Sequence, residues 1–147
     1  LAQAISQSKA NVLFFPDEGA MKRYSQQACM PYLFGVKSRD WETGAITGLD
    51  IIGKIQHVPF NTIIIDDICS KGRTFYESAL KLKELGANEV SLYVTHCENS
   101  IHYGEFGEKK QSLLDCGLIT SVFTTKSILT KEHPMIHVLG GKENVED

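Results

Sequence analysis

Two adjacent acids, Asp66 and Asp67, follow a run of isoleucines and precede a short polar loop. The run 63–65 predicts a buried strand, and a helical pattern begins at Phe75, so the acids are expected where a strand turns towards a helix. Backbone N–H groups and the helix dipole attract phosphate at such a turn. Carboxylates accept hydrogen bonds from sugar hydroxyls or hold a hydrated Mg²⁺. The segment therefore predicts a site for a phosphorylated, hydroxylated ligand.

The loop that follows the acids carries groups that suit a phosphate. Ser70 and Thr74 supply hydroxyl donors, and Gly72 permits positive φ or a close approach of the backbone. Lys71 and Arg73 add positive charge. The alternative is an ordinary solvated turn between a strand and a helix. The complete order of apolar strand, two acids, polar loop, Gly-x-Thr and helix is more specific than any of its parts and favours the phosphate site.

This order resembles the ribose-phosphate-binding signature of type I phosphoribosyltransferases and of phosphoribosyl pyrophosphate (PRPP) synthetases. The resemblance implies that ribose 5-phosphate binds with its phosphate on the loop 70–74 and its hydroxyls on Asp66 and Asp67. The chain departs from the family pattern at Lys71 and Arg73, where small residues are common. Both charges are compatible with a bound phosphate.

A second acid and glycine follow the apolar run 12–15. Asp17, Gly19 and Arg23 have the spacing Asp-x-Gly-x-x-x-Arg at the start of a predicted helix. By itself the segment is either a second anion site or a solvated helix start with surface basic residues. It resembles the pyrophosphate-contacting segment of PRPP synthetases. The resemblance implies that Asp17, Gly19 and Arg23 bind pyrophosphate and that Asp17 binds Mg²⁺.

Lys37 and Arg39 begin a polar, glycine-bearing segment, residues 37–54, that predicts a flexible β-arm. The pair is alternatively two solvated charges on a loop. PRPP synthetases carry a similar Lys-x-Arg pair after the second strand and before a flexible loop. The resemblance implies that Lys37 and Arg39 are catalytic and neutralise phosphoryl groups during transfer. Phosphoribosyltransferases that modify bases do not require such a pair, so it favours the synthetase.

The apolar segments predict an α/β fold. Strands alternate with helices, which implies right-handed crossovers and a mostly parallel central sheet with flanking helices in three layers, similar to type I phosphoribosyltransferases. Ligands bind beyond the carboxyl ends of such strands, so Asp17, Lys37, Asp66 and His96 are expected along one rim. The predicted strands are 12–15, 32–36, 62–65, 89–95, 119–124 and 135–139, and the predicted helices are 20–29 and 75–85, the second closed by Gly86.

The composition indicates which classes of protein the chain can belong to. The 147 residues suit a single domain, and an apolar fraction of 42% with 22% charged residues is ordinary for globular proteins. A net charge of −3 gives no general attraction to nucleic acid or to anionic membranes, and no apolar run is long enough to span a bilayer. The four cysteines are widely spaced and indicate reduced thiols, so a cytoplasmic location is expected, with neither nucleic acid nor membrane as partner.

The opening LAQAISQSKA has the pattern of a helix that started earlier in a longer chain. The resemblance runs from about residue 11 to residue 137 and corresponds to the C-terminal half of a PRPP synthetase. We therefore expect residues 1–147 to form one phosphoribosyltransferase-like domain of a two-domain protein. The resemblance also implies a homo-oligomer.

The leading functional prediction is a ribose-phosphate diphosphokinase of nucleotide biosynthesis, with ribose 5-phosphate, ATP or PRPP as partners and Mg²⁺ as cofactor. One alternative is a phosphoribosyltransferase that uses PRPP to modify a base. The other is a non-catalytic regulatory relative. If the first is right, the isolated chain is expected to have little or no activity.

Overall fold

A computed structural model of the chain describes residues 1–69, 71–125 and 132–139. In these residues the chain forms one seven-stranded sheet. The strands are β1 (Val12–Phe15), β2 (Tyr32–Arg39), β3 (Ile46–Ile52), β4 (Phe60–Cys69), β5 (Ala87–Cys97), β6 (Ser121–Thr124) and β7 (Ile136–Val138). Their order across the sheet is β3-β2-β1-β4-β5-β6-β7. Every neighbouring pair is parallel except β2 and β3, which are antiparallel.

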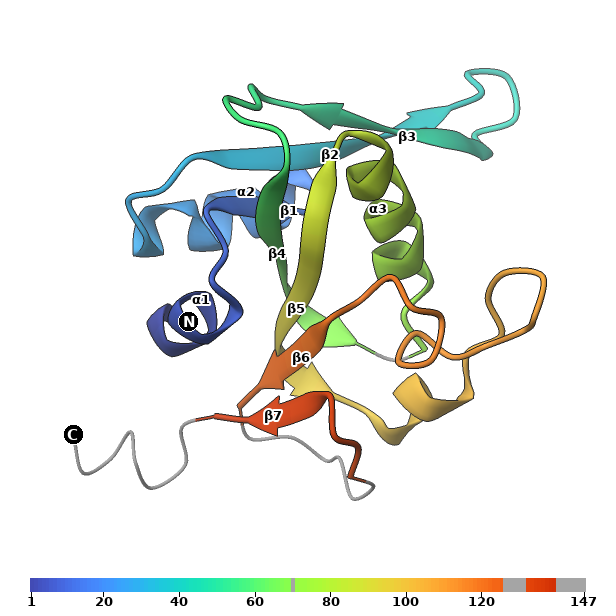
Figure 1. Cartoon of the computed structure of the whole chain (residues 1–147). Coiled ribbons are helices and arrows are strands. Elements are labelled where there is room, and N and C mark those ends of the chain that lie inside the picture. The colour runs from blue at the N-terminus through green and yellow to red at the C-terminus, as the bar shows by residue number, and fades with distance from the viewer. Residues whose placement is uncertain (70, 126–131, 140–147) are drawn as a thin grey trace.

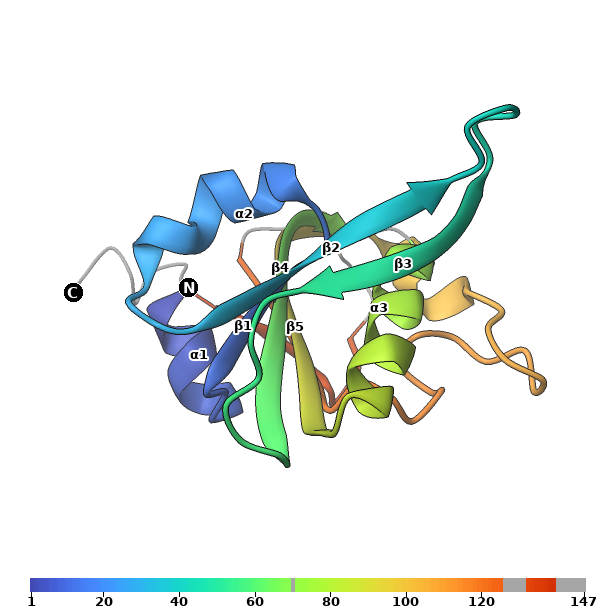
Figure 2. The same ribbon diagram turned by 90° about the horizontal axis from the view of Figure 1, so that it is seen from above.

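Helices cover both faces of the sheet (Figures 1 and 2). The helices α1 (Ala2–Ser8) and α2 (Glu18–Tyr24) lie on one face, and α3 (Arg73–Glu84) lies on the other. Two short 3₁₀ helices, η1 (Ser25–Gln27) and η2 (Asn99–Tyr103), follow α2 and β5. The predicted three-layer α/β fold with a mostly parallel sheet is confirmed.

The isoleucine run of β4 joins the two hydrophobic layers. Successive side chains of a strand point to opposite faces of its sheet. Ile63 and Ile65 accordingly pack with the helices α1 and α2, whereas Ile64 packs with α3, and all three are fully buried. Each buried isoleucine contributes about 1.5–3 kcal/mol through removal of apolar surface from water.

The helix α3 presents Phe75, Ala79 and Leu82 to the sheet, as its apolar spacing predicts. It ends before Gly86, which has φ 107° and lies against Val58. The predicted closing glycine is therefore confirmed. The helix begins at Arg73, two residues before the predicted start, so Arg73 and Thr74 belong to its first turn.

Two strands run further than their apolar stretches predict. The strand β4 continues to Cys69, so Asp66 and Asp67 lie within it; Asp66 pairs with Val94 of β5. The strand β2 continues to Arg39 because β3 folds back along it. The expectation that Asp66, Lys37 and His96 follow strand ends is thus wrong. Asp17 does follow the end of β1. Hydrogen bonding between neighbouring strands extends each one past its hydrophobic residues.

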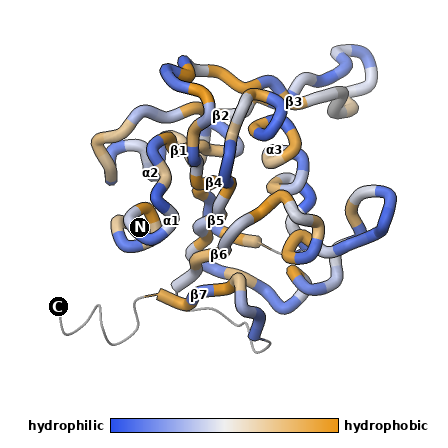
Figure 3. The backbone as a smooth tube through the Cα atoms, viewed as in Figure 1, coloured by the Kyte–Doolittle hydropathy of each residue, from blue (hydrophilic) through white to orange (hydrophobic). Residues whose placement is uncertain are grey.

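The predicted β-arm is the antiparallel ribbon of β2 and β3, which extends from the body of the molecule (Figure 2). Its tip, residues 40–45, and the loop 107–111 are both largely hydrophilic (Figure 3). Trp41 lies at the tip and is 91% exposed. Among the described residues, none of the helices has the length and apolar character that crossing a membrane requires.

Candidate functional site

The strand order reverses between β1 and β4, and this reversal creates the candidate site. The two strands are parallel neighbours, but β1 leads into α2 on one face and β4 leads into α3 on the other (Figure 1). Loops that leave a sheet in opposite directions leave a crevice at the carboxyl ends of the strands, where α/β proteins bind ligands. The topology therefore places Asp17, which follows β1, and Asp66, towards the end of β4, at the same edge of the sheet, as the sequence predicts.

A cavity of about 480 Å³ lies at this crevice. Of the residues predicted to bind ribose 5-phosphate, Ser70 lies outside the described residues, and Asp67 does not line the cavity. The others do: the lining residues are Asp66, Ile68, Lys71, Gly72, Arg73, Thr74, Phe75 and Ser100. A carboxylate, two cationic side chains and a helix N-terminus thus face one space, which suits a sugar phosphate.

Gly72 shapes the part of this cavity that the predicted phosphate loop forms. It caps α3 with φ 101° and ψ 24°, and its carbonyl accepts a hydrogen bond from Tyr76 N at 2.8 Å. A β-carbon at this position would lie 2.8 Å from Cδ2 of Leu113, which is fully buried. Only glycine can adopt this positive φ and also avoid a collision with Leu113 without strain. Arg73, in the first turn, forms an exposed ion pair with Glu77 at 3.6 Å.

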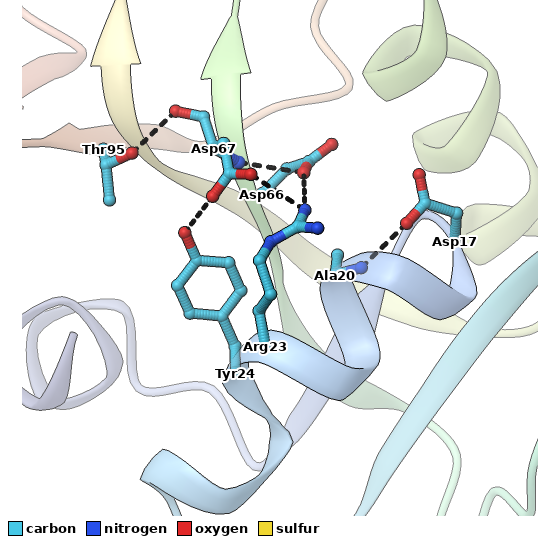
Figure 4. Close-up of polar contacts among 7 residues, drawn as sticks. All are labelled: Asp17, Ala20, Arg23, Tyr24, Asp66, Asp67 and Thr95. Carbon is cyan, nitrogen blue, oxygen red and sulfur yellow. Dashed lines mark hydrogen bonds and ion pairs between the residues drawn. The ribbon is translucent and has the colours of Figure 1, made fainter.

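The two acids make different contacts (Figure 4). The hydroxyl of Tyr24 donates to Oδ1 of Asp67, and Arg23 Nη2 lies 2.8 Å from Oδ2 of the same carboxylate. The same Arg23 nitrogen lies 3.4 Å from Oδ1 of Asp66. The backbone N–H of Asp67 also donates to that Asp66 oxygen, at 2.8 Å. Thr95 Oγ1 donates to the carbonyl oxygen of Asp67 at 2.9 Å.

Burial and charge shift the protonation of this cluster. Burial raises the pKa of Asp66, and the carboxylates of Asp17 and Asp67 raise it further; the Asp67 amide and Arg23 act in the opposite direction. Burial, followed by the hydrogen bond to Asp67, raises the pKa of Tyr24 to about 12. Tyr24 therefore remains a hydrogen-bond donor at neutral pH. The Asp17 carboxylate, which follows β1, thus acts on the pKa of Asp66 in β4.

The raised pKa of Asp66 leads to a prediction about stability. A carboxyl whose pKa in the folded state exceeds its ordinary value, here 3.8, favours the unfolded state when it is ionised. Asp66→Asn is therefore expected to raise the unfolding temperature near neutral pH. The advantage should shrink as the pH falls through the raised pKa, since wild-type Asp66 then becomes neutral. Thermal unfolding between about pH 3 and pH 7 tests this; a variant less stable than wild type at neutral pH would contradict it.

The predicted pyrophosphate segment has a structural role in this conformation. Oδ1 of Asp17 caps α2 by accepting a hydrogen bond from Ala20 N at 2.8 Å (Figure 4), and Gly19 lies in the first turn of that helix. Arg23 points to Asp66 and Asp67. Within the ranges that the structure describes, no group of three or more His, Cys, Asp or Glu side chains gathers as a metal site. The roles of Asp17, Gly19 and Arg23 towards pyrophosphate, and of Asp17 towards Mg²⁺, remain predictions.

A second cavity, of about 530 Å³, lies between the β-arm and α3. Lys37 and Leu49 line it from the arm, and Arg73 and Thr74 line it from α3, so it adjoins the first cavity. Arg39 instead donates from Nη1 to the carbonyl oxygen of Gly44 at 3.1 Å, towards the tip of the arm. The structure therefore brings Lys37, but not Arg39, to the predicted phosphate loop.

Several residues of the site were not predicted from the sequence. Tyr24 directly follows Arg23, but nothing in its spacing indicates a bond to an acid 43 positions away. Thr95 belongs to an apolar run, and its contact with Asp67 depends on the pairing of β4 with β5. Ser100 reaches the first cavity from η2, an element that the sequence does not predict.

Comparison with known proteins places these features in context. No protein-family model matches the sequence. Ribose-phosphate pyrophosphokinase 3, chloroplastic, of Oryza sativa subsp. japonica is 35% identical over 95 residues, which are 64% of this chain and 22% of that protein. Ribose-phosphate pyrophosphokinase of Aeropyrum pernix is 28% identical over 140 residues, 90% of this chain and 41% of that protein. The chain resembles part of a ribose-phosphate pyrophosphokinase. The resemblance predicted from the motifs is confirmed.

Solved structures show the same fold. The phosphoribosylpyrophosphate synthetase of Mycobacterium smegmatis matches 94% of this chain and 44% of its own, with a TM-score of 0.64 and 20% identity. The adenine phosphoribosyltransferase of Thermoanaerobacter pseudethanolicus matches 67% of this chain and 64% of its own, with a TM-score of 0.51 and 17% identity. The predicted likeness to type I phosphoribosyltransferases in fold is confirmed. The chain spans between 22% and 41% of the two pyrophosphokinase sequences described above.

Proposed function

We propose that this chain is a domain of a ribose-phosphate diphosphokinase. The reaction transfers the β,γ-diphosphoryl group of ATP to the 1-hydroxyl of ribose 5-phosphate and yields PRPP and AMP. The observation that carries the proposal is the first cavity, where Asp66 faces the loop and helix N-terminus of residues 71–74. The names of the sequence relatives support it. A phosphoribosyltransferase would use the same cavity, but the names of these sequence relatives do not support that alternative.

The proposed mechanism depends on position and charge. The N-terminus of α3, with Lys71 and Thr74, holds the 5-phosphate, and Asp66 accepts hydrogen bonds from the ribose hydroxyls. The first cavity adjoins the second through Arg73 and Thr74, which line both. Lys37, which lines the second cavity together with Thr74, neutralises the diphosphoryl group as its negative charge develops. Holding the reactants in this arrangement lowers the entropic part of the barrier.

We propose that Asp17 and Asp66 would hold Mg²⁺ together with the phosphates of the substrate. Asp17 follows β1, Asp66 lies in β4, the parallel neighbour of β1, and the Asp17 carboxylate raises the pKa of Asp66. Mg²⁺ is commonly held by one or two carboxylates together with substrate phosphates, so these residues fit it. The ion would supply positive charge to the diphosphoryl group. Oδ1 of Asp17 caps α2, which would leave the other oxygen of that carboxylate to bind the ion.

The activity belongs, in this proposal, to a longer protein of which the chain is the C-terminal half. The chain spans only part of the length of these relatives, which supports a longer protein, whereas its place as the C-terminal half belongs to the proposal alone. We further propose that the complete protein is a cytoplasmic homo-oligomer. The widely spaced cysteines support a reducing compartment.

Ribose 5-phosphate binding by the wild-type chain is the direct test of the proposed function. Thr74→Val is expected to weaken that binding by about 1.5–3 kcal/mol, because it removes a hydroxyl donor to a charged phosphate. Isothermal titration calorimetry measures the affinity of the wild type and that of the variant. Thr62→Val is a matched control, since the buried Thr62 hydroxyl has no hydrogen-bond partner among the described residues. Absence of binding to the wild type, or equal affinity in Thr74→Val, would count against the proposed site.

A further inference from the structure

Both carboxylate oxygens of Asp67 have partners from α2. Tyr24 donates to Oδ1, and Arg23 forms an ion pair with Oδ2 at 2.8 Å (Figure 4). The backbone carbonyl of Asp67 is held by Thr95 of β5. Contacts from two different elements thus fix the side chain and the backbone of this acid.

Asp66 is oriented differently. Its Oδ1 accepts from the Asp67 amide at 2.8 Å and lies 3.4 Å from Arg23, while within the described residues its Oδ2 forms no hydrogen bond. Asp66 lines the first cavity, whereas Asp67 does not. One carboxylate is therefore presented to the ligand, and its neighbour is engaged by the protein.

The partners of Asp67 are held in place by the core. Tyr24 is 9% exposed and packs with Leu13, Ile63 and Ile65 on the α2 face of the sheet. A packed tyrosine ring has little rotational freedom, so its hydroxyl is delivered to a defined point. Arg23 precedes it in the last turn of α2, with its side chain partly in solvent. The seating of α2 on the sheet therefore sets both contacts.

We propose that Tyr24 and Arg23 are positioning residues for sugar recognition: they hold Asp67, and Asp67 in turn orients Asp66, the acid that contacts the ribose hydroxyls. This inference rests on the proposed function and assigns unequal roles to two acids that the sequence predicts to act alike. The link from Asp67 to Asp66 is the 2.8 Å hydrogen bond between the amide of one and the carboxylate of the other. Tyr24 remains protonated well above neutral pH, so it acts as a constant donor.

The test compares affinities for two probes, ribose 5-phosphate and inorganic phosphate, across a set of variants. Asp66→Asn is expected to weaken ribose 5-phosphate binding by about 10-fold or more, the loss of a hydrogen bond to a charged group. Tyr24→Phe and Asp67→Asn should each weaken it by roughly 5-fold, since they disturb orientation only. The double variant Tyr24→Phe/Asp67→Asn should match Asp67→Asn, because both changes act through one carboxylate. Affinity for inorganic phosphate should not fall in any of them, and in Asp66→Asn, which removes a negative charge from the same cavity, it should be equal to or higher than that of the wild type.

Tyr32→Phe provides the matched control, since Tyr32 is half-exposed and contacts Phe15 by its ring edge. It should bind both probes as wild type does. If the wild type binds ribose 5-phosphate and Tyr24→Phe binds it equally well, the inference is overturned and the proposed function stands. Additive losses in the double variant, or weaker phosphate binding in Tyr24→Phe, would indicate a general structural role and also overturn it. A wild type that binds no ribose 5-phosphate overturns both proposals.

Discussion

Replacing Lys37 and Arg39 together with alanine is expected to reduce AMP release by the complete protein on the order of 10³-fold, the loss typical of a cationic group that stabilises phosphoryl transfer. Ribose 5-phosphate affinity should remain near that of the wild type. The two charges would act on the transition state, so their removal lowers the rate and leaves ground-state binding almost intact. Measurement of AMP formation from ATP and ribose 5-phosphate, with calorimetry of the sugar phosphate, separates these two effects.

The single variants should differ from one another. Lys37 lines the cavity that Thr74 also lines, whereas Arg39 bonds to the carbonyl of Gly44 near the tip of the arm. Lys37→Ala is therefore expected to account for most of the loss. An equal loss in Arg39→Ala would show that the arm closes and brings Arg39 to the substrate. Trp41, the single tryptophan, is at that tip and almost fully exposed, so its fluorescence reports such closure directly.

Lys54→Ala is the matched control, because it removes one exposed lysine just beyond the same arm. It should leave AMP release unchanged. If the Lys37 and Arg39 double variant also keeps full AMP release, the main reason to prefer a synthetase is lost. The phosphoribosyltransferase alternative would then lead.

Gly72→Ala is expected to lower the free energy of unfolding by about 2–6 kcal/mol, from the strain of a positive φ and from collision in a packed core. Gly72 has φ 101°, and a β-carbon there would approach Leu113 to 2.8 Å. The loop has to shift to relieve this contact. Because the same loop forms the wall of the first cavity, ribose 5-phosphate affinity should fall as well.

Gly117→Ala separates the cost of a positive φ from the cost of a collision with a neighbouring side chain. Gly117 also has positive φ, 85°, but a β-carbon there meets nothing within 4 Å. This variant should show only the backbone cost, about 1 kcal/mol, and normal sugar-phosphate binding. Chemical denaturation and calorimetry of both variants make the comparison. Equal losses of stability at Gly72 and Gly117 would show that contact with Leu113 is unimportant.

Local signals in the sequence determined the fold class and the kind of chemistry. The isoleucine run before Asp66 predicts a strand, the spacing of Phe75, Ala79 and Leu82 predicts the helix that follows, and Gly86 predicts its end. Such patterns are readable because strand and helix periodicities depend on residues close together in the chain. The order of acids, loop and glycine likewise indicated a sugar phosphate, since helix N-termini and carboxylates have fixed chemical preferences.

The tertiary structure alone decided how the site is assembled. The strand β4 continues through Asp66 and Asp67 because β5 offers hydrogen bonds beside them, which no property of the acids themselves indicates. Tyr24 and Arg23 reach these acids only because α2 packs on the sheet next to β4. Likewise, Lys37 adjoins the predicted phosphate loop only because the arm passes over α3. These contacts join residues far apart in the chain, and their geometry depends on how whole elements pack, which local spacing does not encode.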